Sequence, residues 1–170
     1  MKELKSIPFL GDYIDGQWVK SDRPDGEFLD ISPSDLKDQV MKLNYRHDHV
    51  AQACLAAKEA FKTWSQETPE KRIGMIRKLK EVYIAHAEQI AEVIARETGK
   101  PLWESATEAK SMVNKIDITL DFSMKLIAEE RIVNALPNVD GYVRHRPRGV
   151  MAVLGPFNFP GHLPNGHIIP

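Results

Sequence analysis

The chain has 170 residues, of which 42% are hydrophobic and 28% are charged, and its net charge is −1. This composition predicts a globular domain, or part of one, and excludes a disordered chain. The near-zero charge argues against a nucleic-acid-binding domain, and no apolar run is long enough to span a membrane. Cys54 is the single cysteine, which excludes an intrachain disulfide and a cysteine-rich metal site and favours a reducing, cytoplasmic setting.

The first part of the chain predicts short β-strands. Asp15-Gly16 lies between two β-prone runs and supplies the positive φ angles of a tight turn, so residues 13–19 are expected to form a hairpin. Apolar residues recur within residues 27–32, which favours a strand. A further strand is expected over residues 38–45.

Helices are expected from about residue 48 onward. In residues 48–64, apolar side chains recur at steps of three and four and form one stripe: Val50, Cys54, Ala57, Phe61 and Trp64. A buried core thiol is therefore favoured for Cys54 over a catalytic thiol, because free cysteine is among the most buried residue types.

Local signals mark where the following helices begin and end. Thr68-Pro69 predicts a helix start, with Thr68 as the N-cap. A bend or short break is expected near residues 85–87. Gly99 is expected to end this region in the left-handed conformation, and a long helix is expected over residues 102–130.

Two pairs of ionisable residues invite a functional hypothesis. Glu104 and Glu108 share one helical side, but a solvated face or an ion pair with a neighbouring lysine is favoured over an acid/base pair, because chemistry needs a cleft. His162 and His167 lie five residues apart, which is a poor spacing for two metal ligands on a helix. Hydrogen bonding around a turn is the favoured role of these histidines, and no metal site is predicted.

The last quarter of the chain predicts two strands. Residues 142–146 are basic, which favours a solvated edge strand over an anion or nucleic-acid site. Residues 150–154 are apolar throughout, which favours a strand buried on both faces, as in a parallel sheet. The carboxyl end of such a strand is a common nucleotide site, although no glycine-rich phosphate motif is present.

The stretch from Gly155 to Pro160 predicts a rigid turn, because Gly-Pro and Phe-Pro pairs restrict the backbone. The turn presents Asn158 between two aromatic residues. A side-chain amide held in this way can stabilise an oxyanion. From the residues alone, an amide that satisfies the local backbone is the favoured alternative.

Gly155-Pro156-Phe157-Asn158-Phe159-Pro160 resembles the "P-[WFY]-N-[FY]-P" signature of NAD(P)-dependent aldehyde dehydrogenases. Asp15-Gly16-Gln17-Trp18 and Glu97-Thr98-Gly99-Lys100-Pro101 are similar to other landmarks of that family, in the same order, so that the resemblance covers nearly the whole chain. Residues 161–167 also resemble the branch of the family that oxidises N-succinylglutamate 5-semialdehyde in bacterial arginine breakdown. Residues 32–46 depart from the family pattern, which usually has an Asn-Pro-x-[ST]-Gly-Glu turn in this region.

The resemblance implies an α/β fold of which this chain is the N-terminal portion, mostly helical with an N-terminal hairpin and C-terminal strands. Residues 1–135 would hold the hairpin and helices of the cofactor-binding domain. Residues 136–149 would start the strands used in homo-oligomerisation. Residues 150–170 would supply the buried strand, the turn and the start of a helix.

The resemblance also implies roles for individual residues. Asn158 would donate its amide to the oxygen of a thiohemiacetal formed from a small aldehyde substrate. The cofactor, NAD or else NADP, would pass along Leu154, Gly155, Pro156 and Phe157. The family's catalytic cysteine and glutamate would lie beyond Pro170, so the chain alone is expected to be inactive.

Two alternatives to this enzyme remain open at this point. An aldehyde dehydrogenase with another substrate is one, because most substrate-pocket residues of the family lie elsewhere. A non-catalytic helical module that self-associates through its strands is the other, because an apolar strand at residues 150–154 would lack neighbours.

Overall fold

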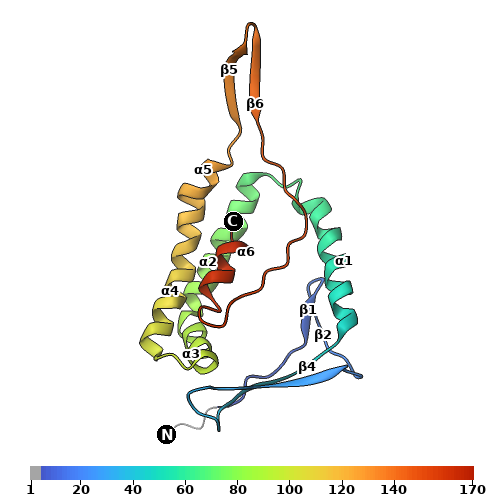
Figure 1. The fold of residues 1–170 in the computed structure, drawn as a ribbon, viewed down its shortest axis with the longest axis vertical. Helices are drawn as coiled ribbons and strands as arrows, with labels where there is room; N and C mark the ends of the chain where they lie inside the picture. The colour runs from blue at the N-terminus through green and yellow to red at the C-terminus, as the bar shows by residue number, and fades with distance from the viewer. Residues whose placement is uncertain (1–4) are drawn as a thin grey trace.

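The computed structural model describes residues 5–170, which form helices, three small sheets and a long C-terminal coil (Figure 1). The helices are α1 (His47–Trp64), α2 (Pro69–Ala85), α3 (Ala87–Thr98), α4 (Leu102–Ile118), the π-helical turn η1 (Thr119–Ser123), α5 (Met124–Leu126) and α6 (His162–Ile168). The strands are β1 (Asp12–Ile14), β2 (Gln17–Val19), β3 (Gly26–Ile31), β4 (Gln39–Tyr45), β5 (Glu130–Leu136) and β6 (Val139–Val143). Within residues 5–170, no helix is both long and apolar enough to cross a membrane.

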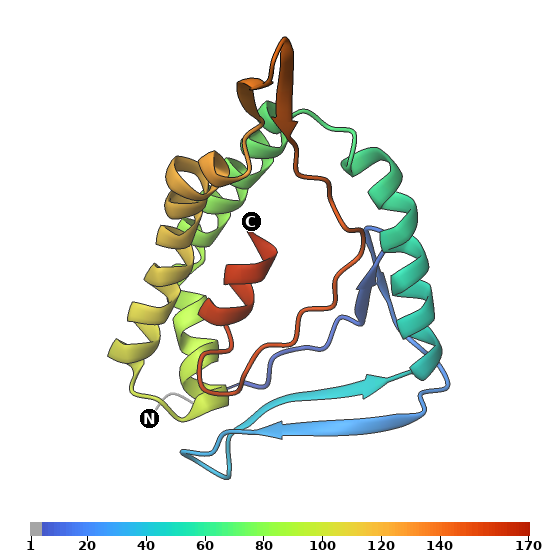
Figure 2. The same ribbon diagram turned by 45° about the horizontal axis from the view of Figure 1, so that its top comes forward.

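The helices α2, α3, α4 and α6 pack into one helical cluster (Figure 2). Thr68 caps α2 by accepting a hydrogen bond from the backbone N–H of Lys71, and Pro69 takes the first helical position, as predicted. His86 separates α2 from α3, which confirms the predicted break. The core of the helical cluster consists of these buried side chains: Ala91, Ile94, Ala109, Met112, Ile116 and Ile169.

The two sheets near the N-terminus follow their sequence signals. Asp15 and Gly16 have φ angles of 50° and 75°, so that the β1–β2 hairpin closes through the turn that the Asp-Gly pair predicted. β3 pairs antiparallel with β4, with one register shift after Asp30. Both predicted strands of this second sheet are confirmed.

A buried ion pair fastens the β3–β4 sheet to the helical cluster. Arg96 of α3 donates from Nε and Nη2 to the two carboxylate oxygens of Asp38, at 2.9 and 2.7 Å. The two side chains are only 10% and 4% exposed. Nearby, Gly99 ends α3 with a φ of 73°, as predicted, and its missing Cβ lets Pro33 pack directly on the helix end.

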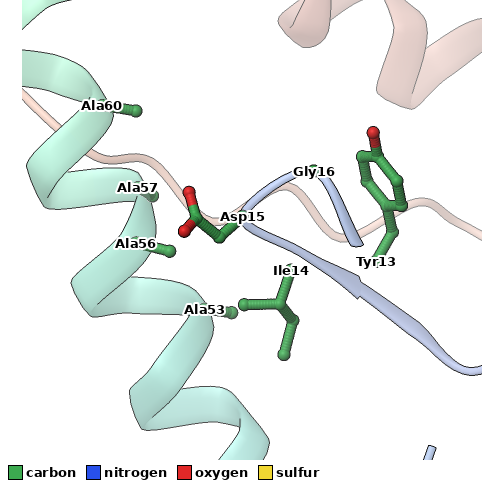
Figure 3. A pocket seen from close by; sticks show the side chains of 8 residues that line it. All are labelled: Tyr13, Ile14, Asp15, Gly16, Ala53, Ala56, Ala57 and Ala60. Atoms are coloured by element: carbon green, nitrogen blue, oxygen red, sulfur yellow. The ribbon is translucent and has the colours of Figure 1, made fainter. Parts of the chain in front are cut away.

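α1 stands apart from the helical cluster, across the C-terminal coil (Figure 2). The tip of the β1–β2 hairpin faces a row of small side chains on α1, as Figure 3 shows: Ala53, Ala56, Ala57 and Ala60. The predicted helix is confirmed but its predicted burial is wrong, because Val50 is 65% exposed and Cys54 is exposed rather than a core thiol. The described residues cover little of the apolar stripe of α1, which explains the difference.

The helix predicted over residues 102–130 ends earlier than expected. α4 continues through η1 into α5, which ends at Leu126, and β5 begins at Glu130. β5 and β6 then form a hairpin that projects from the end of the helical cluster (Figure 1). The strands thus start before residue 136. The β-branched pair Ile132-Val133 favours a strand, but the Glu, Ala and Leu residues around it are common in helices, so the sequence did not mark this boundary. At the base of the hairpin, Arg144 pairs with Glu129 in an exposed position, as a solvated edge requires.

The buried strand predicted over residues 150–154 is wrong. These residues are coil, and Met151 and Leu154 are 63% and 93% exposed. A strand needs hydrogen-bonded neighbours, whereas the three sheets of residues 5–170 are each two strands paired with one another. The basic strand predicted over residues 142–146 likewise ends at Val143 and continues as coil.

Candidate active site

The turn over residues 155–160 leads from the coil into α6. Prolines fix the backbone φ on either side of Asn158, and the turn leaves the Asn158 side chain exposed. Phe157 and Leu154 are also exposed, at 90% and 93% of their surface. The residues predicted to do chemistry and to touch a cofactor therefore lie together on an accessible surface.

The backbone before Asn158 folds back onto α6. A Cβ at Gly155 would lie 3.0 Å from Cγ of Pro164, so a larger residue at position 155 would push the turn away from the helix. Pro156 is half-buried. The backbone N–H of Leu163 donates to the carbonyl oxygen of Phe159 at 3.3 Å. The turn and the start of α6 thus form one compact unit.

A buried carboxylate on α4 holds the residues that follow the turn. Glu108 is only 3% exposed. Its Oε1 accepts hydrogen bonds from the backbone N–H groups of Gly161 at 2.9 Å and His162 at 3.1 Å. These N–H groups belong to the start of α6 and have no acceptor within the helix. The side chain of Glu108 therefore supplies the acceptor from a neighbouring helix.

Lys100 links Glu108 to the turn itself. Its Nζ donates to Oε2 of Glu108 at 2.9 Å and lies 3.8 Å from the centre of the Phe159 ring. Burial pushes the pKa of Glu108 up, but hydrogen bonds from the backbone of His162, from Lys100 and from the backbone of Gly161 outweigh burial and leave the pKa below its ordinary value. The ion pair expected for Glu108 is confirmed, whereas a solvated position is not.

A buried amide makes a second connection between α6 and the helical cluster. Asn165 is 1% exposed. Its Nδ2 donates to the carbonyl oxygen of Met112 at 3.1 Å, and its Oδ1 accepts from the hydroxyl of Tyr83 at 3.1 Å. A Cβ at Gly161 would lie 2.7 Å from Sδ of Met112, so α6 approaches α4 as closely as glycine permits. These contacts set the position of α6 from three separate points.

The two histidines of α6 lie in different environments. His167 is exposed, and Nδ1 of His162 is buried without a hydrogen-bond partner among the described residues. The hydrogen bonding expected of the His162 side chain is therefore wrong at Nδ1, although its backbone N–H is engaged by Glu108. Within residues 5–170, no cluster of three or more His, Cys, Asp or Glu side chains could hold a metal ion.

The sequence as a whole matches known proteins. A sequence profile described as the aldehyde dehydrogenase family matches residues 18–170. The chain belongs to the aldehyde dehydrogenase family. "N-succinylglutamate 5-semialdehyde dehydrogenase 2" of Caulobacter vibrioides is 41% identical over 165 residues, which cover 94% of this chain and 32% of that relative. The protein named N-succinylglutamate 5-semialdehyde dehydrogenase in Paraburkholderia xenovorans is 45% identical over 158 residues, 93% of this chain and 32% of its own length.

Solved structures agree with this family assignment. A betaine aldehyde dehydrogenase of Staphylococcus aureus in complex with NAD+ has a TM-score of 0.82 and is 27% identical, and the match covers 95% of this chain and 32% of that one. The methylmalonate-semialdehyde dehydrogenase of Oceanimonas doudoroffii has a TM-score of 0.78 at 28% identity, covering 94% and 32%. The predicted aldehyde-dehydrogenase-like fold is confirmed.

This aldehyde dehydrogenase chain spans about a third of the length of those relatives and structures. Within it, the structure brings Asn158, Leu154, Gly155, Pro156 and Phe157 together in one continuous exposed segment. Cys54, by contrast, lies on α1, on the other side of the coil from α6 (Figure 2).

Sequence reasoning missed the residues that support this segment. The contact of Lys100 with the ring of Phe159 and the hydrogen bond of Asn165 with Tyr83 join residues far apart in the sequence, and no local pattern reveals them. Glu108 gave a signal, because its pairing with a lysine was foreseen. Its two backbone partners on α6 lie 53 and 54 residues away and were not.

Proposed function

We propose that this chain is the N-terminal part of an NAD(P)-dependent aldehyde dehydrogenase. The full-length enzyme would oxidise N-succinylglutamate 5-semialdehyde to the carboxylic acid, and this reaction would be a cytoplasmic step of arginine breakdown. The observation that carries the substrate is the 41% identity, over 94% of this chain, with a relative of that name. The exposed amide of Asn158, on a turn that leads into the helix α6 anchored by α2 and α4, supports a place for chemistry within the chain.

Asn158 would act as a hydrogen-bond donor to an oxyanion. When a thiolate adds to an aldehyde carbonyl, the carbonyl oxygen becomes an alkoxide, and a fixed amide N–H stabilises that charge more than it stabilises the neutral aldehyde. Pro156 and Pro160, each two residues from Asn158, reduce the reorganisation needed at that moment, because the turn already has its shape. The alternative is a purely structural role, in which the Asn158 side chain would hydrogen-bond to the local backbone. The exposure of this side chain favours contact with a ligand instead.

Leu154, Gly155, Pro156 and Phe157 would contact the dinucleotide cofactor. Two of these side chains are large, apolar and almost fully exposed, and the backbone beside them belongs to no sheet. Apolar surface next to free backbone donors and acceptors suits a ligand that carries both flat rings and ribose hydroxyls. The cofactor would accept the hydride of the substrate, and this segment would hold and orient it.

The thiolate and the base that activates water would come from elsewhere in the protein. Cys54 is the single cysteine of the 170 residues, and it lies on α1 rather than beside Asn158. We therefore expect that these 170 residues alone oxidise no aldehyde. A measurable rate of nicotinamide reduction by the isolated chain would contradict this.

We also propose that the β5–β6 hairpin contributes to contacts between copies of the full-length enzyme. Every residue of β5 is exposed, including Ile132, Val133 and Leu136. Val139 and Val143 of β6 are exposed as well, and apolar side chains on both strands of a projecting two-stranded ribbon favour a protein partner. Light scattering should give an oligomer for the full-length protein, and a monomer would count against this part of the proposal.

The substrate is tested by a competition between aldehydes. The full-length protein should reduce NAD with N-succinylglutamate 5-semialdehyde at a higher kcat/KM than with betaine aldehyde or methylmalonate semialdehyde, the substrates named for its structural relatives. A preference for one of those two would keep the enzyme class and replace the substrate. Absence of nicotinamide reduction with all three would favour the second candidate, a non-catalytic module that associates through its exposed apolar surfaces.

A further inference from the structure

Glu108 is an unusual residue to find in the core of the helical cluster. A carboxylate loses most of its hydration on burial, so it is retained only where specific partners compensate for that loss. Here the partners are two backbone N–H groups at the start of α6 and the ammonium of Lys100. All three partners adjoin the turn that carries Asn158, which lies only three residues before Gly161 in the sequence.

We propose that Glu108 is a positioning residue for Asn158: it fixes the backbone at Gly161 and His162 and, through Lys100, the ring of Phe159, and so aims the Asn158 amide. This inference rests on the proposed function, because the aim of an amide matters only if the amide meets an oxyanion. The physical reason is that oxyanion stabilisation requires the donor to sit within hydrogen-bond range of where the charge develops.

The two oxygens of Glu108 have separate tasks. Oε1 accepts both backbone N–H groups, and Oε2 faces Nζ of Lys100. All of these partners are donors, so the site requires an acceptor on each side. A glutamine at position 108 has nearly the same shape, but either orientation of its amide points an N–H₂ group at a donor. Glu108→Gln therefore disturbs the anchor while leaving the packing almost unchanged.

Lys100 completes the connection on the other side of Pro160. Its side chain is 14% exposed, and its ammonium lies over the Phe159 ring at 3.8 Å from the ring centre. The ring thus meets the positive charge through its negative face. Phe159 directly follows Asn158 and is held by Lys100, while Gly161 is held by Glu108, so the downstream half of the turn is fixed at two points.

Glu104 provides a matched control for the charge of Glu108. It lies one helical turn earlier on α4 and also faces Lys100, at 3.8 Å. Its side chain is 39% exposed, and its Lys100 contact is the only ion pair that it makes within residues 5–170. Glu104→Gln removes the same charge from the same lysine and leaves the anchor of α6 in place.

The experiment compares Glu108→Gln, Glu104→Gln, Asn158→Ala and the double variant Glu108→Gln/Asn158→Ala in the full-length enzyme. Glu108→Gln should lower kcat about tenfold or more, with KM for NAD within about twofold of the parent. Glu104→Gln should change neither value beyond about twofold. In the Asn158→Ala background, Glu108→Gln should cost almost nothing further, because a residue that acts through Asn158 has nothing left to position.

Hydrogen exchange separates a failure of this inference from a failure of the proposed function. The amides of Gly161 and His162 should exchange about tenfold faster in Glu108→Gln than in Glu104→Gln. If the parent oxidises no aldehyde, the proposed function falls, and this exchange comparison alone decides whether Glu108 anchors the turn. Equal exchange in the two variants, or kinetic losses of Glu108→Gln and Asn158→Ala that multiply fully, would overturn the positioning role.

Discussion

Replacing Asp38 by asparagine should loosen the β3–β4 sheet from α3. The substitution would keep the shape of the side chain but remove the carboxylate that hydrogen-bonds and directly neutralises the guanidinium of Arg96. Both side chains are nearly buried, at 4% and 10% exposure, and both bonds are short, at 2.7 and 2.9 Å. Breaking such a pair costs about 3 kcal/mol or more. This cost should appear as easier local opening of β4 and the end of α3.

Native-state hydrogen exchange of the full-length protein measures this local opening directly. A loss of about 3 kcal/mol corresponds to roughly 100-fold faster exchange of the β4 amides. The control is Glu27→Gln in the same sheet, which breaks an ion pair with Lys42 whose side chains are 57% and 62% exposed. That exposed pair should contribute less than about 1 kcal/mol. If Asp38→Asn accelerated exchange no more than Glu27→Gln, the account of this ion pair would be refuted.

The effect of Asp38→Asn should also depend on pH. Hydrogen bonds from Arg96 hold the pKa of Asp38 below its ordinary value. A carboxyl whose pKa is lower in the folded state stabilises the fold above its unfolded pKa, which is about 3.9, and loses that contribution as the pH falls through the folded pKa. The difference between parent and Asp38→Asn should therefore be constant at neutral pH and shrink once the pH falls below about 4. A difference that vanished between pH 8 and 6 would contradict the assignment.

Two further substitutions test the helical cluster, each by thermal unfolding of the full-length protein beside the parent. Thr68→Ala removes the side-chain oxygen that caps α2 through the N–H of Lys71, and should cost about 1 kcal/mol, whereas Thr68→Ser should keep most of the cap. Gly161→Ala would bring a Cβ within 2.7 Å of Sδ of Met112 and should cost about 1–3 kcal/mol, with a lower kcat because α6 moves. An unchanged melting temperature and kcat in Gly161→Ala would show that α6 tolerates displacement from α4.

The helices and turns that the sequence predicted correctly are those with local causes. Thr68-Pro69 and Gly99 act within a few residues of themselves, so their effect on α2 and α3 can be read without knowledge of the fold. The Asp15-Gly16 turn is equally local. These positions define the start of α2, the end of α3 and the first hairpin.

The wrong predictions concern burial and strand pairing, which depend on distant partners. The apolar stripe of α1 and the apolar run over residues 150–154 both predicted core positions, but an apolar pattern only indicates a face that can be covered. Among the described residues, little covers α1, and no strand pairs with residues 150–154. Cys54 is exposed for the same reason.

In the candidate site, too, the features with local causes were predicted and those that depend on distant partners were not. Asn158 and the residues before it were found from a continuous motif, because prolines and aromatics at fixed spacing leave a sequence signature. Their support was not found, because it comes from single residues on α2 and α4 that reach α6 across the fold: Tyr83, Glu108 and Met112. The residues proposed to do the chemistry are thus marked by a local motif, and the contacts that position them are tertiary.

The most direct test of the central claim is the turnover of Asn158→Ala in the full-length enzyme. Removing an oxyanion donor should lower kcat by about 100- to 1,000-fold while KM for NAD changes little, because the amide acts only when charge develops on the substrate oxygen. Gln52→Ala, which removes an exposed amide from α1, should leave kcat unchanged. A kcat of Asn158→Ala within about twofold of the parent would contradict the claim that this turn stabilises the reacting oxygen.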